Sequence, residues 1–147
     1  MIVVGIDGSD GARRALEFAV EEALLRDSDL RIVSAWHVPV QLFSSGAVAR
    51  QQDLDAFETS MRATAEEQVS AAVAGRDGLR YELAMREGLA SVVLVDESDR
   101  AELLVVGSRG HGGFSSLLLG SVSQQCAAHA ACPVAIVPAH ARPRPVG

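Results

Sequence analysis

The sequence predicts a single α/β domain built as an open, doubly wound parallel sheet of five strands, with helices on both faces. Three observations support this fold class. Short apolar runs alternate with longer helical patterns, in the order β-α-β-α-β-α-β-α-β. Apolar strands separated by helices imply a parallel sheet covered on both sides. The length of 147 residues fits one domain.

In the first half of the chain, residues 2–7 form an apolar, β-branched strand that ends at Asp-Gly. A helix follows from Gly11, because apolar residues then recur at helical spacing and Ser9 or Asp10 can cap it. The next predicted elements are a strand at residues 30–37, a loop at 38–50 and a helix at 51–74.

In the second half, residues 79–86 alternate apolar and charged side chains and predict the third strand. Residues 88–98 are ambiguous, since their valines favour a strand whereas the alternation of elements favours a short helix; we predict a helix. Then come a strand at 102–106, a glycine- and serine-rich loop at 107–119, a helix at 120–131, a strand at 134–137 and a mobile tail at 139–147.

The composition excludes several functions. The net charge is −6 and no basic patch is visible, which argues against nucleic acid. No apolar run approaches the roughly 20 residues of a membrane helix, and no basic segment precedes an apolar start, so we expect a cytoplasmic protein without a signal peptide. The two cysteines, Cys126 and Cys132, form no CxxC pair, and we expect them to be reduced and buried.

All 13 basic residues are arginine, because the sequence contains no lysine. This excludes a Schiff-base lysine and the phosphate-binding lysine of a Walker A loop. Any polyphosphate would therefore be held by backbone amides, hydroxyl groups, a metal ion or arginine.

Open α/β sheets bind ligands beyond the carboxyl ends of their strands. Asp7 ends the first predicted strand, Val38 follows the second and Gly107 ends the fourth. The loop after Gly107 is rich in glycine, which lets the backbone approach a ligand closely. It leads into a helix that starts at Gly120-Ser121, where free N–H groups favour an anion.

Ser121 and Ser123 add hydroxyl donors at this helix start, so the loop predicts phosphate binding; a flexible surface loop is the alternative. The loop is neither a Walker A loop nor a GxGxxG turn. His111 within it is expected to face solvent, not to act as a base, and the four histidines show no metal-ligand spacing.

The segment 2–138 resembles the universal stress protein family, close to its A-type, ATP-binding members. The family signature G-x2-G-x9-G-[ST] is met by Gly107, Gly110, Gly120 and Ser121. Further matches are Val-Val-Gly-Ile-Asp-Gly-Ser at residues 3–9, Ser-Val-Ser at 121–123 and His-Ala-Ala-Cys-Pro-Val at 129–134. The domain therefore spans residues 1–138.

This resemblance implies a Rossmann-like sheet with strand order 3-2-1-4-5, bound ATP with Mg²⁺ or Mn²⁺, and a homodimer. The dimer would pair the edge strand at 134–137 with that of a second copy. Asp7 would lie beside the nucleoside and the backbone near Val38 would face the adenine. The ribose and phosphates would contact Gly107, Arg109 and Gly110, and the phosphates would be held by Gly120, Ser121, Val122 and Ser123.

The resulting hypothesis is an ATP-binding stress-response protein that acts through nucleotide occupancy and protein interaction, with slow or no hydrolysis. Neither a catalytic base nor a Walker B acid is evident. Three alternatives stay open. They are an enzyme of nucleotidyl or phosphoryl transfer that uses the same crevice, an interaction module in which ATP is structural, and a sensor of another adenine nucleotide such as cyclic AMP.

Overall fold

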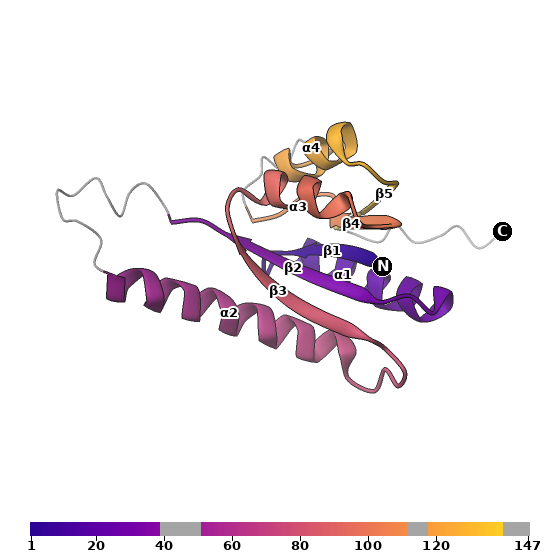
Figure 1. Ribbon diagram of the computed structural model, residues 1–147, viewed down its shortest axis with the longest axis horizontal. Coiled ribbons are helices and arrows are strands. Elements are labelled where there is room, and N and C mark those ends of the chain that lie inside the picture. Colours follow the sequence, from indigo (N-terminus) through magenta and orange to yellow (C-terminus); the bar gives the residue numbers. More distant parts are fainter. Residues whose placement is uncertain (39–50, 112–117, 140–147) are drawn as a thin grey trace.

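The chain folds into one five-stranded parallel sheet with the strand order β3-β2-β1-β4-β5 (Figure 1). The computed structural model describes residues 1–38, 51–111 and 118–139. Strands and helices alternate along the chain, which confirms the predicted fold class and strand order. The elements are β1 (Ile2–Ile6), α1 (Asp10–Arg26), β2 (Leu30–Trp36), α2 (Gln51–Val73), β3 (Tyr81–Glu87), α3 (Ala90–Ser98), β4 (Leu103–Gly107), α4 (Ser121–His129) and β5 (Val134–Val137).

The sheet has an apolar core on each face. Helices α1 and α2 cover one face and α3 and α4 cover the other (Figure 1). Side chains alternate between the two faces along each strand. Thus Ile2 and Val4 of β1 pack with α1, whereas Val3 packs on the side of α3 and α4. All three are fully buried, so β1 is apolar throughout because neither face of it meets water.

Helix α1 has well-formed caps at both ends. The hydroxyl of Ser9 accepts a hydrogen bond from the Ala12 N–H at 3.2 Å, which confirms Ser9 as the cap. At the other end, Asp27 adopts a left-handed conformation with φ 49° and its N–H returns to the last carbonyls of the helix. Between the caps, the buried residues follow the helical spacing seen in the sequence: Gly11, Ala12, Ala15, Leu16, Ala19, Val20 and Ala23.

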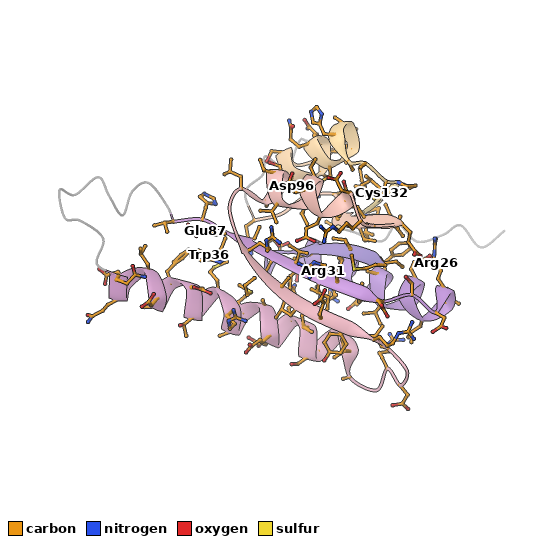
Figure 2. The ribbon with its side chains drawn as sticks, viewed as in Figure 1. Arg26, Arg31, Trp36, Glu87, Asp96 and Cys132 are labelled. Carbon is orange, nitrogen blue, oxygen red and sulfur yellow. The ribbon has the colours of Figure 1, made fainter. Side chains whose placement is uncertain are left out.

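Helix α2 is longer than α1 but packs more loosely. Among its described residues only Ala65 and Val69 are buried. Its first half contacts the sheet through Phe57, whose ring centroid lies 6.2 Å from that of Trp36. Trp36 lies at the end of β2 (Figure 2). Helix α2 therefore covers β2 and β3 through a narrow apolar stripe, with most of its surface in solvent.

The ambiguous segment after β3 is a helix, as predicted, and it spans Ala90–Ser98. Val93 and Leu94 are buried against the sheet, whereas Val92 is exposed. The valines therefore belong to a short helix with one buried face, not to a strand. Strand β3 begins at Tyr81, two residues later than expected. The reason is that Leu79 still belongs to a turn, where its N–H donates to the Arg76 carbonyl at 3.3 Å.

Three sequence predictions lie wholly or partly outside the described residues: the loop beyond Val38, residues 112–117 of the glycine-rich loop, and the tail beyond Ala139. Within the described part, Cys126 is fully buried, and burial raises the pKa of its thiol to about 11. Cys132 is half-buried, and the two are free thiols. No helix in the described part of the chain is long and apolar enough to span a bilayer.

Candidate functional site

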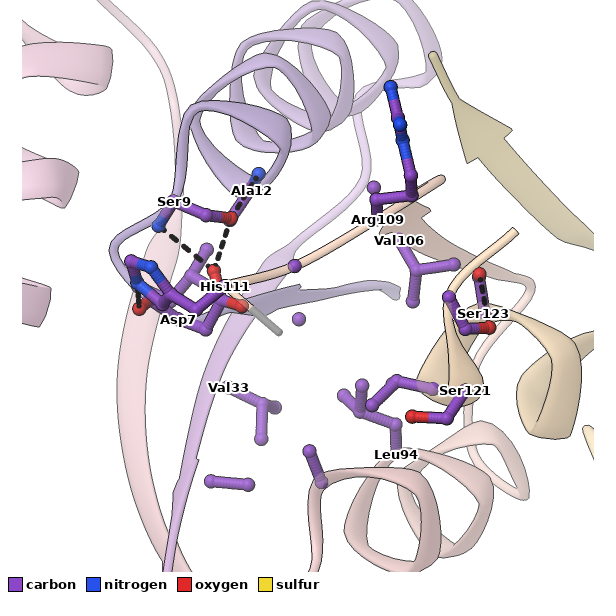
Figure 3. Close-up of a pocket in the computed structure, with 18 residues that line it drawn as sticks. Asp7, Ser9, Ala12, Val33, Leu94, Val106, Arg109, His111, Ser121 and Ser123 are labelled. Atoms are coloured by element: carbon purple, nitrogen blue, oxygen red, sulfur yellow. Dashed lines mark hydrogen bonds between the residues drawn. The ribbon is translucent and has the colours of Figure 1, made fainter. Parts of the chain in front are cut away.

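A pocket of about 320 Å³ opens at the carboxyl ends of β1 and β4 (Figure 3). These two strands are neighbours in the sheet but far apart in sequence, so the pocket lies at the topological switch point, where open α/β sheets bind ligands. The structure brings eight of the nine predicted site residues to its lining: Asp7, Gly107, Arg109, Gly110, Gly120, Ser121, Val122 and Ser123.

Val38 is the ninth, and it does not line the pocket. Strand β2 instead contributes Val33 and Ala35, which face the pocket together with Ala90 and Leu94 of α3. The sequence predicts that the backbone near Val38, beyond the end of β2, faces the adenine. In the structure the inner wall is formed by the strand itself and by the helix packed over it.

The close packing of α3 depends on Gly5 of β1. A Cβ atom at this position would lie 2.6 Å from Cδ1 of Leu94, so any larger residue would force the Leu94 side chain to move. Leu94 is buried and lines the pocket. The absent side chain at residue 5 thus sets the depth of the apolar wall.

Asp7 lies in the turn between β1 and α1, and its carboxylate is held locally. Oδ1 accepts hydrogen bonds from the Ser9 N–H at 2.9 Å and from the Ser9 hydroxyl (Figure 3). Oδ2 lies 2.5 Å from the point where Gly110 would carry a Cβ. The carboxylate therefore abuts the backbone of the glycine-rich loop, and a side chain on Gly110 would collide with it.

The glycines of the signature are not equivalent. A Cβ on Gly107 would lie 2.9 Å from the backbone carbon and oxygen of Gly11, and one on Gly11 would collide with the Arg109 carbonyl. These two glycines let the end of β4 lie directly on the start of α1. Gly120 differs, because its φ of −75° suits any residue and its nearest non-local atom would be 3.4 Å from a Cβ.

Helix α4 starts at the pocket without a side-chain cap. The first N–H groups of a helix have no intrahelical partner, so those of Ser121, Val122 and Ser123 are left at the pocket with the positive end of the helix dipole. The side chain of Ser121 is exposed there. This arrangement suits an anionic group.

The hydroxyl of Ser123 is engaged within the chain. Ser123 is buried, and its Oγ lies 2.9 Å from the Ser108 carbonyl and 3.0 Å from the Gly120 carbonyl. A hydroxyl has a single hydrogen to donate, and here the chain itself accepts it. Ser123 therefore offers its backbone N–H to the pocket, while its hydroxyl holds the loop to the helix.

Ser108 connects the pocket to the edge of the sheet. Its carbonyl accepts the Gly120 N–H at 2.7 Å, and its own N–H donates to the Val137 carbonyl at 2.8 Å. Its hydroxyl accepts the Ala139 N–H at 3.2 Å. One buried serine thus joins the start of α4 to the end of β5, and it anchors the first residue of the predicted tail.

Two residues of the loop, Arg109 and His111, line the pocket in different ways. Arg109 lines the pocket, but in Figure 3 its guanidinium extends away from the centre of the pocket. His111 is exposed, as predicted, yet it also lines the pocket and its Nε2 lies 2.6 Å from the Asp7 carbonyl oxygen (Figure 3). Spacing along the sequence could not reveal this contact, because 104 residues separate the two partners.

Helix α3 is held over the sheet by ion pairs. Two nitrogens of the Arg31 guanidinium, Nε and Nη2, donate hydrogen bonds to the Glu97 carboxylate at 2.7 and 3.1 Å. Arg86 binds the same carboxylate at 3.0 Å. The hydrogen bond to Arg31 is the main cause that lowers the pKa of Glu97. This carboxylate therefore stays ionised at neutral pH and fixes the helix that carries Leu94.

The described residues contain no group of three or more histidine, cysteine, aspartate or glutamate side chains that could hold a metal ion. Among the predicted site residues, only Asp7 offers a carboxylate to the pocket. A cation at this site would accordingly need other ligands, such as the oxygens of a bound phosphate.

The fold and the pocket define an α/β domain with a glycine-lined site at the switch point of its sheet. Residues 1–138 match the universal stress protein family, and the chain belongs to that family. It is similar to universal stress protein Rv2624c of Mycobacterium tuberculosis, with 37% identity over 136 residues, which is 92% of this chain and 47% of that protein. The chain thus spans about half the length of this relative.

A universal stress protein of Thermus aquaticus is 34% identical over 140 residues, which cover 92% of this chain and 96% of that protein. Among solved structures, a universal stress protein in complex with cAMP is 28% identical, with a TM-score of 0.65 over 95% of this chain and 96% of that one. UspA of Lactobacillus plantarum has a TM-score of 0.76 at 21% identity over 92% of this chain and 95% of that one, and shows the shared fold.

Proposed function

We propose that this chain binds an adenine nucleotide, with ATP as the principal ligand, and acts in a stress response through occupancy of the site and protein interaction. The observation that carries the proposal is the pocket itself. It brings the Asp7 carboxylate, the glycine signature and the uncapped start of α4 to one place. The similar protein solved with cAMP supports an adenine nucleotide.

The phosphates would lie at the start of α4. Backbone N–H groups at a helix start bind anions without any cationic side chain, which matches a chain that lacks lysine. Ser121 adds the exposed hydroxyl. The adenine would lie against the apolar wall formed by Val33, Ala35 and Leu94, since a base buries mostly apolar surface.

The charge of a triphosphate supports a metal ion on the nucleotide. Residues 107–123 contain one arginine, Arg109, and its guanidinium extends away from the pocket centre. Mg²⁺ or Mn²⁺ bound to the phosphates would supply the missing positive charge. We expect ATP to bind more weakly in EDTA than with Mg²⁺, and cyclic AMP, with its single negative charge, to bind equally well in both.

We propose that hydrolysis is slow or absent. His111 is the histidine beside the pocket, and its Nε2 is occupied by the Asp7 carbonyl. The rival function is phosphoryl or nucleotidyl transfer in the same crevice. Incubation with ATP and Mg²⁺ separates the two: turnover faster than about once per minute, a barrier below about 20 kcal/mol, would favour the enzyme.

The sharpest binding test uses Ser121, the first residue of α4. Gly120 has φ −75° and ψ 171°, which is the conformation that a residue before proline prefers, and proline is well tolerated at the first helical position. Ser121→Pro removes the N–H and the hydroxyl, whereas Ser121→Ala removes the hydroxyl alone.

Isothermal titration with ATP should show Ser121→Pro about tenfold weaker than Ser121→Ala, the usual effect of losing one hydrogen bond to a charged group. Equal affinities in the two variants would place the phosphates elsewhere. Chromatography of any nucleotide released by heat from the purified parent protein would identify the base and the number of phosphates.

We further propose a homodimer through β5. Strand β5 is the last strand of the sheet, pairs only with β4 among the described residues, and carries no charged residue. Strand β3 at the opposite edge carries Glu82, Arg86 and Glu87, and charges of this kind protect an edge from pairing.

The carbonyls of Pro133 and Val137 point toward β4, so the alternation along the strand directs the N–H of Ile136 outward. Ile136→Pro removes this outward donor, and Ile136→Ala is the matched control that loses the side chain alone. Sedimentation should show dimers for the parent and for Ile136→Ala, and monomers for Ile136→Pro. A monomeric parent would refute this interface.

A further inference from the structure

The apolar stripe of α2 is interrupted by one half-buried glutamine, Gln68. It stands three residues after Ala65 and directly before Val69, the two buried residues of the helix. Placing an amide at such a position is unfavourable unless its polar atoms find partners. Both do: Nε2 donates to the Ser9 carbonyl at 3.1 Å, and Oε1 accepts the Gly8 N–H at 3.2 Å.

The opposite side of the same turn is held by His111. Its Nε2 lies 2.6 Å from the Asp7 carbonyl oxygen. Because a carbonyl can only accept, Nε2 must carry the hydrogen. The Asp7 carbonyl and the Gly8 N–H belong to one peptide group, so a side chain from α2 and a side chain from the β4–α4 loop bind the two ends of the same peptide.

This peptide is one that needs holding. Gly8 has φ 82°, a region that glycine enters and leaves at little cost. Rotation of the Asp7–Gly8 peptide would change the direction of the backbone beside the Asp7 carboxylate, which lines the pocket. With both hydrogen bonds in place, rotation breaks two contacts at once.

We propose that Gln68 and His111 are positioning residues that clamp the Asp7–Gly8 peptide and so couple α2 to the glycine-rich loop of the pocket. The inference rests on the proposed function for its effect on affinity. Helix α2 is loosely packed, so a ligand that stabilises the position of His111 also stabilises the position of α2 through this peptide. Because such coupling is reciprocal, releasing α2 lowers the affinity for the ligand by the same factor by which the ligand favours the docked helix.

The test compares Gln68→Leu with Gln52→Leu. Gln52 lies on the same helix but is exposed, so it is a matched control for the change in side chain. Leucine at residue 68 keeps the apolar stripe continuous. We expect an unchanged or higher midpoint of urea denaturation for Gln68→Leu, together with an ATP dissociation constant about tenfold higher. Gln52→Leu should match the parent in both measurements.

A second pair of measurements addresses the shared peptide. If both side chains act on this peptide, His111→Leu should also lower the affinity for ATP. The double variant should then bind ATP only slightly less tightly than either single variant. Independent, additive losses would overturn the clamp. So would a Gln68→Leu variant whose affinity falls only in proportion to its loss of stability, because a purely structural role would give that result.

Hydrogen exchange of the Gly8 amide, measured by NMR without ligand, tests the clamp separately from the function. We expect faster exchange in Gln68→Leu and in His111→Leu, and parental exchange in Gln52→Leu. If the parent binds no adenine nucleotide, the proposed function fails while this measurement still decides the clamp. Unchanged Gly8 exchange in both clamp variants would overturn it, whatever the parent binds.

Discussion

The two ends of the sheet are built from different interactions. At the amino ends of the strands, charged side chains join neighbouring segments. The N-terminal amine of Met1 lies 2.8 Å from the Glu102 carboxylate, and Arg80 binds Asp27 at 2.8 Å and Asp29 at 2.6 Å. The amine lowers the pKa of Glu102, chiefly through this hydrogen bond.

At the carboxyl ends, glycines let the main chain approach its neighbours closely. Gly107 lies on the backbone of Gly11, and Gly110 lies against the Asp7 carboxylate. Here the connections run through backbone groups, such as the bond from the Gly120 N–H to the Ser108 carbonyl. The close approach leaves the start of α4 open toward the pocket.

The difference shows how one small sheet separates stability from binding. Charged side chains can link the segments at the amino end because no ligand is expected there. Each exposed ion pair contributes little to stability. At the carboxyl end, glycines allow close backbone packing, and the N–H groups of Ser121, Val122 and Ser123 remain available to a ligand. Substitutions at the two ends should therefore affect different measurements.

The largest effect is expected for Gly11→Ala, which would break the main-chain packing of the carboxyl end. The new methyl group would collide with the Arg109 carbonyl, a backbone atom that cannot move alone. We expect a loss of about 3 kcal/mol in the free energy of unfolding, measured in urea, and no detectable ATP binding. Gly120→Ala is the control for stability, since its Cβ makes ordinary contacts; equal stability of the two variants would contradict this view.

Glu97→Gln should have the next largest effect, and it tests whether ion pairs beyond the pocket matter for stability. Glu97 is mostly buried, with 11% of its side chain exposed, and it binds both Arg31 and Arg86. Loss of these charged hydrogen bonds should lower the free energy of unfolding by about 2 kcal/mol. ATP affinity should change less than in Gly11→Ala.

The Glu97 carboxylate should also make the free energy of unfolding depend on pH. Its pKa in the folded state lies below the ordinary value of 4.5, so its stabilisation is complete above that pH and is lost as the pH falls through the folded-state pKa. Urea denaturation of the parent between about pH 6 and pH 3, the range in which carboxylates titrate, should show a steeper loss of stability than that of Glu97→Gln. Parallel profiles would contradict the assignment.

Gly110→Ala should mainly affect binding. Its methyl group would meet Oδ2 of Asp7, a side-chain atom that can move, so the fold should survive while the carboxylate shifts. We expect an ATP dissociation constant about tenfold higher, or about 1.4 kcal/mol, in isothermal titration. A variant that lost stability as Gly11→Ala does would show that the two glycines share one structural role.

The smallest effect is expected for Arg80→Ala at the amino end. The guanidinium is exposed, and its partners Asp27 and Asp29 are exposed as well. The thermal midpoint of Arg80→Ala should fall less than that of Glu97→Gln. The fall should be larger at low salt than at high salt, because salt screens exposed charges. ATP affinity should equal that of the parent. A change in affinity would mean that the two ends of the sheet are coupled.

Much of the fold could be predicted because local patterns carry it. Helical spacing located α1, and the Asp-Gly after β1 located the turn that holds Asp7. The glycine signature located the loop at the pocket, since its spacing reports a strand, a loop and a helix start. These features depend on neighbours in the sequence.

The rest of the site depends on contacts between distant segments. The bond between Ser123 and Ser108, the contact of His111 with Asp7, and the wall formed by Leu94 arise only after the sheet is assembled. Gln68 had a usable signal, because a glutamine stands where the apolar stripe through Ala65 continues. Val38 does not line the pocket, because the apolar wall is formed within β2, before the strand ends, so its contact with the adenine stays a prediction.

The pairing of Trp36 with Phe57 has a practical consequence. Trp36 is the one tryptophan of the sequence, and it lies at the junction between the end of β2 and the first half of α2. Indole fluorescence responds to the polarity around the ring, so the chain contains a single optical reporter at this junction. Its emission can therefore report the docking of α2 in solution without any added label. Changes at the amino end of the sheet should leave this emission unaltered.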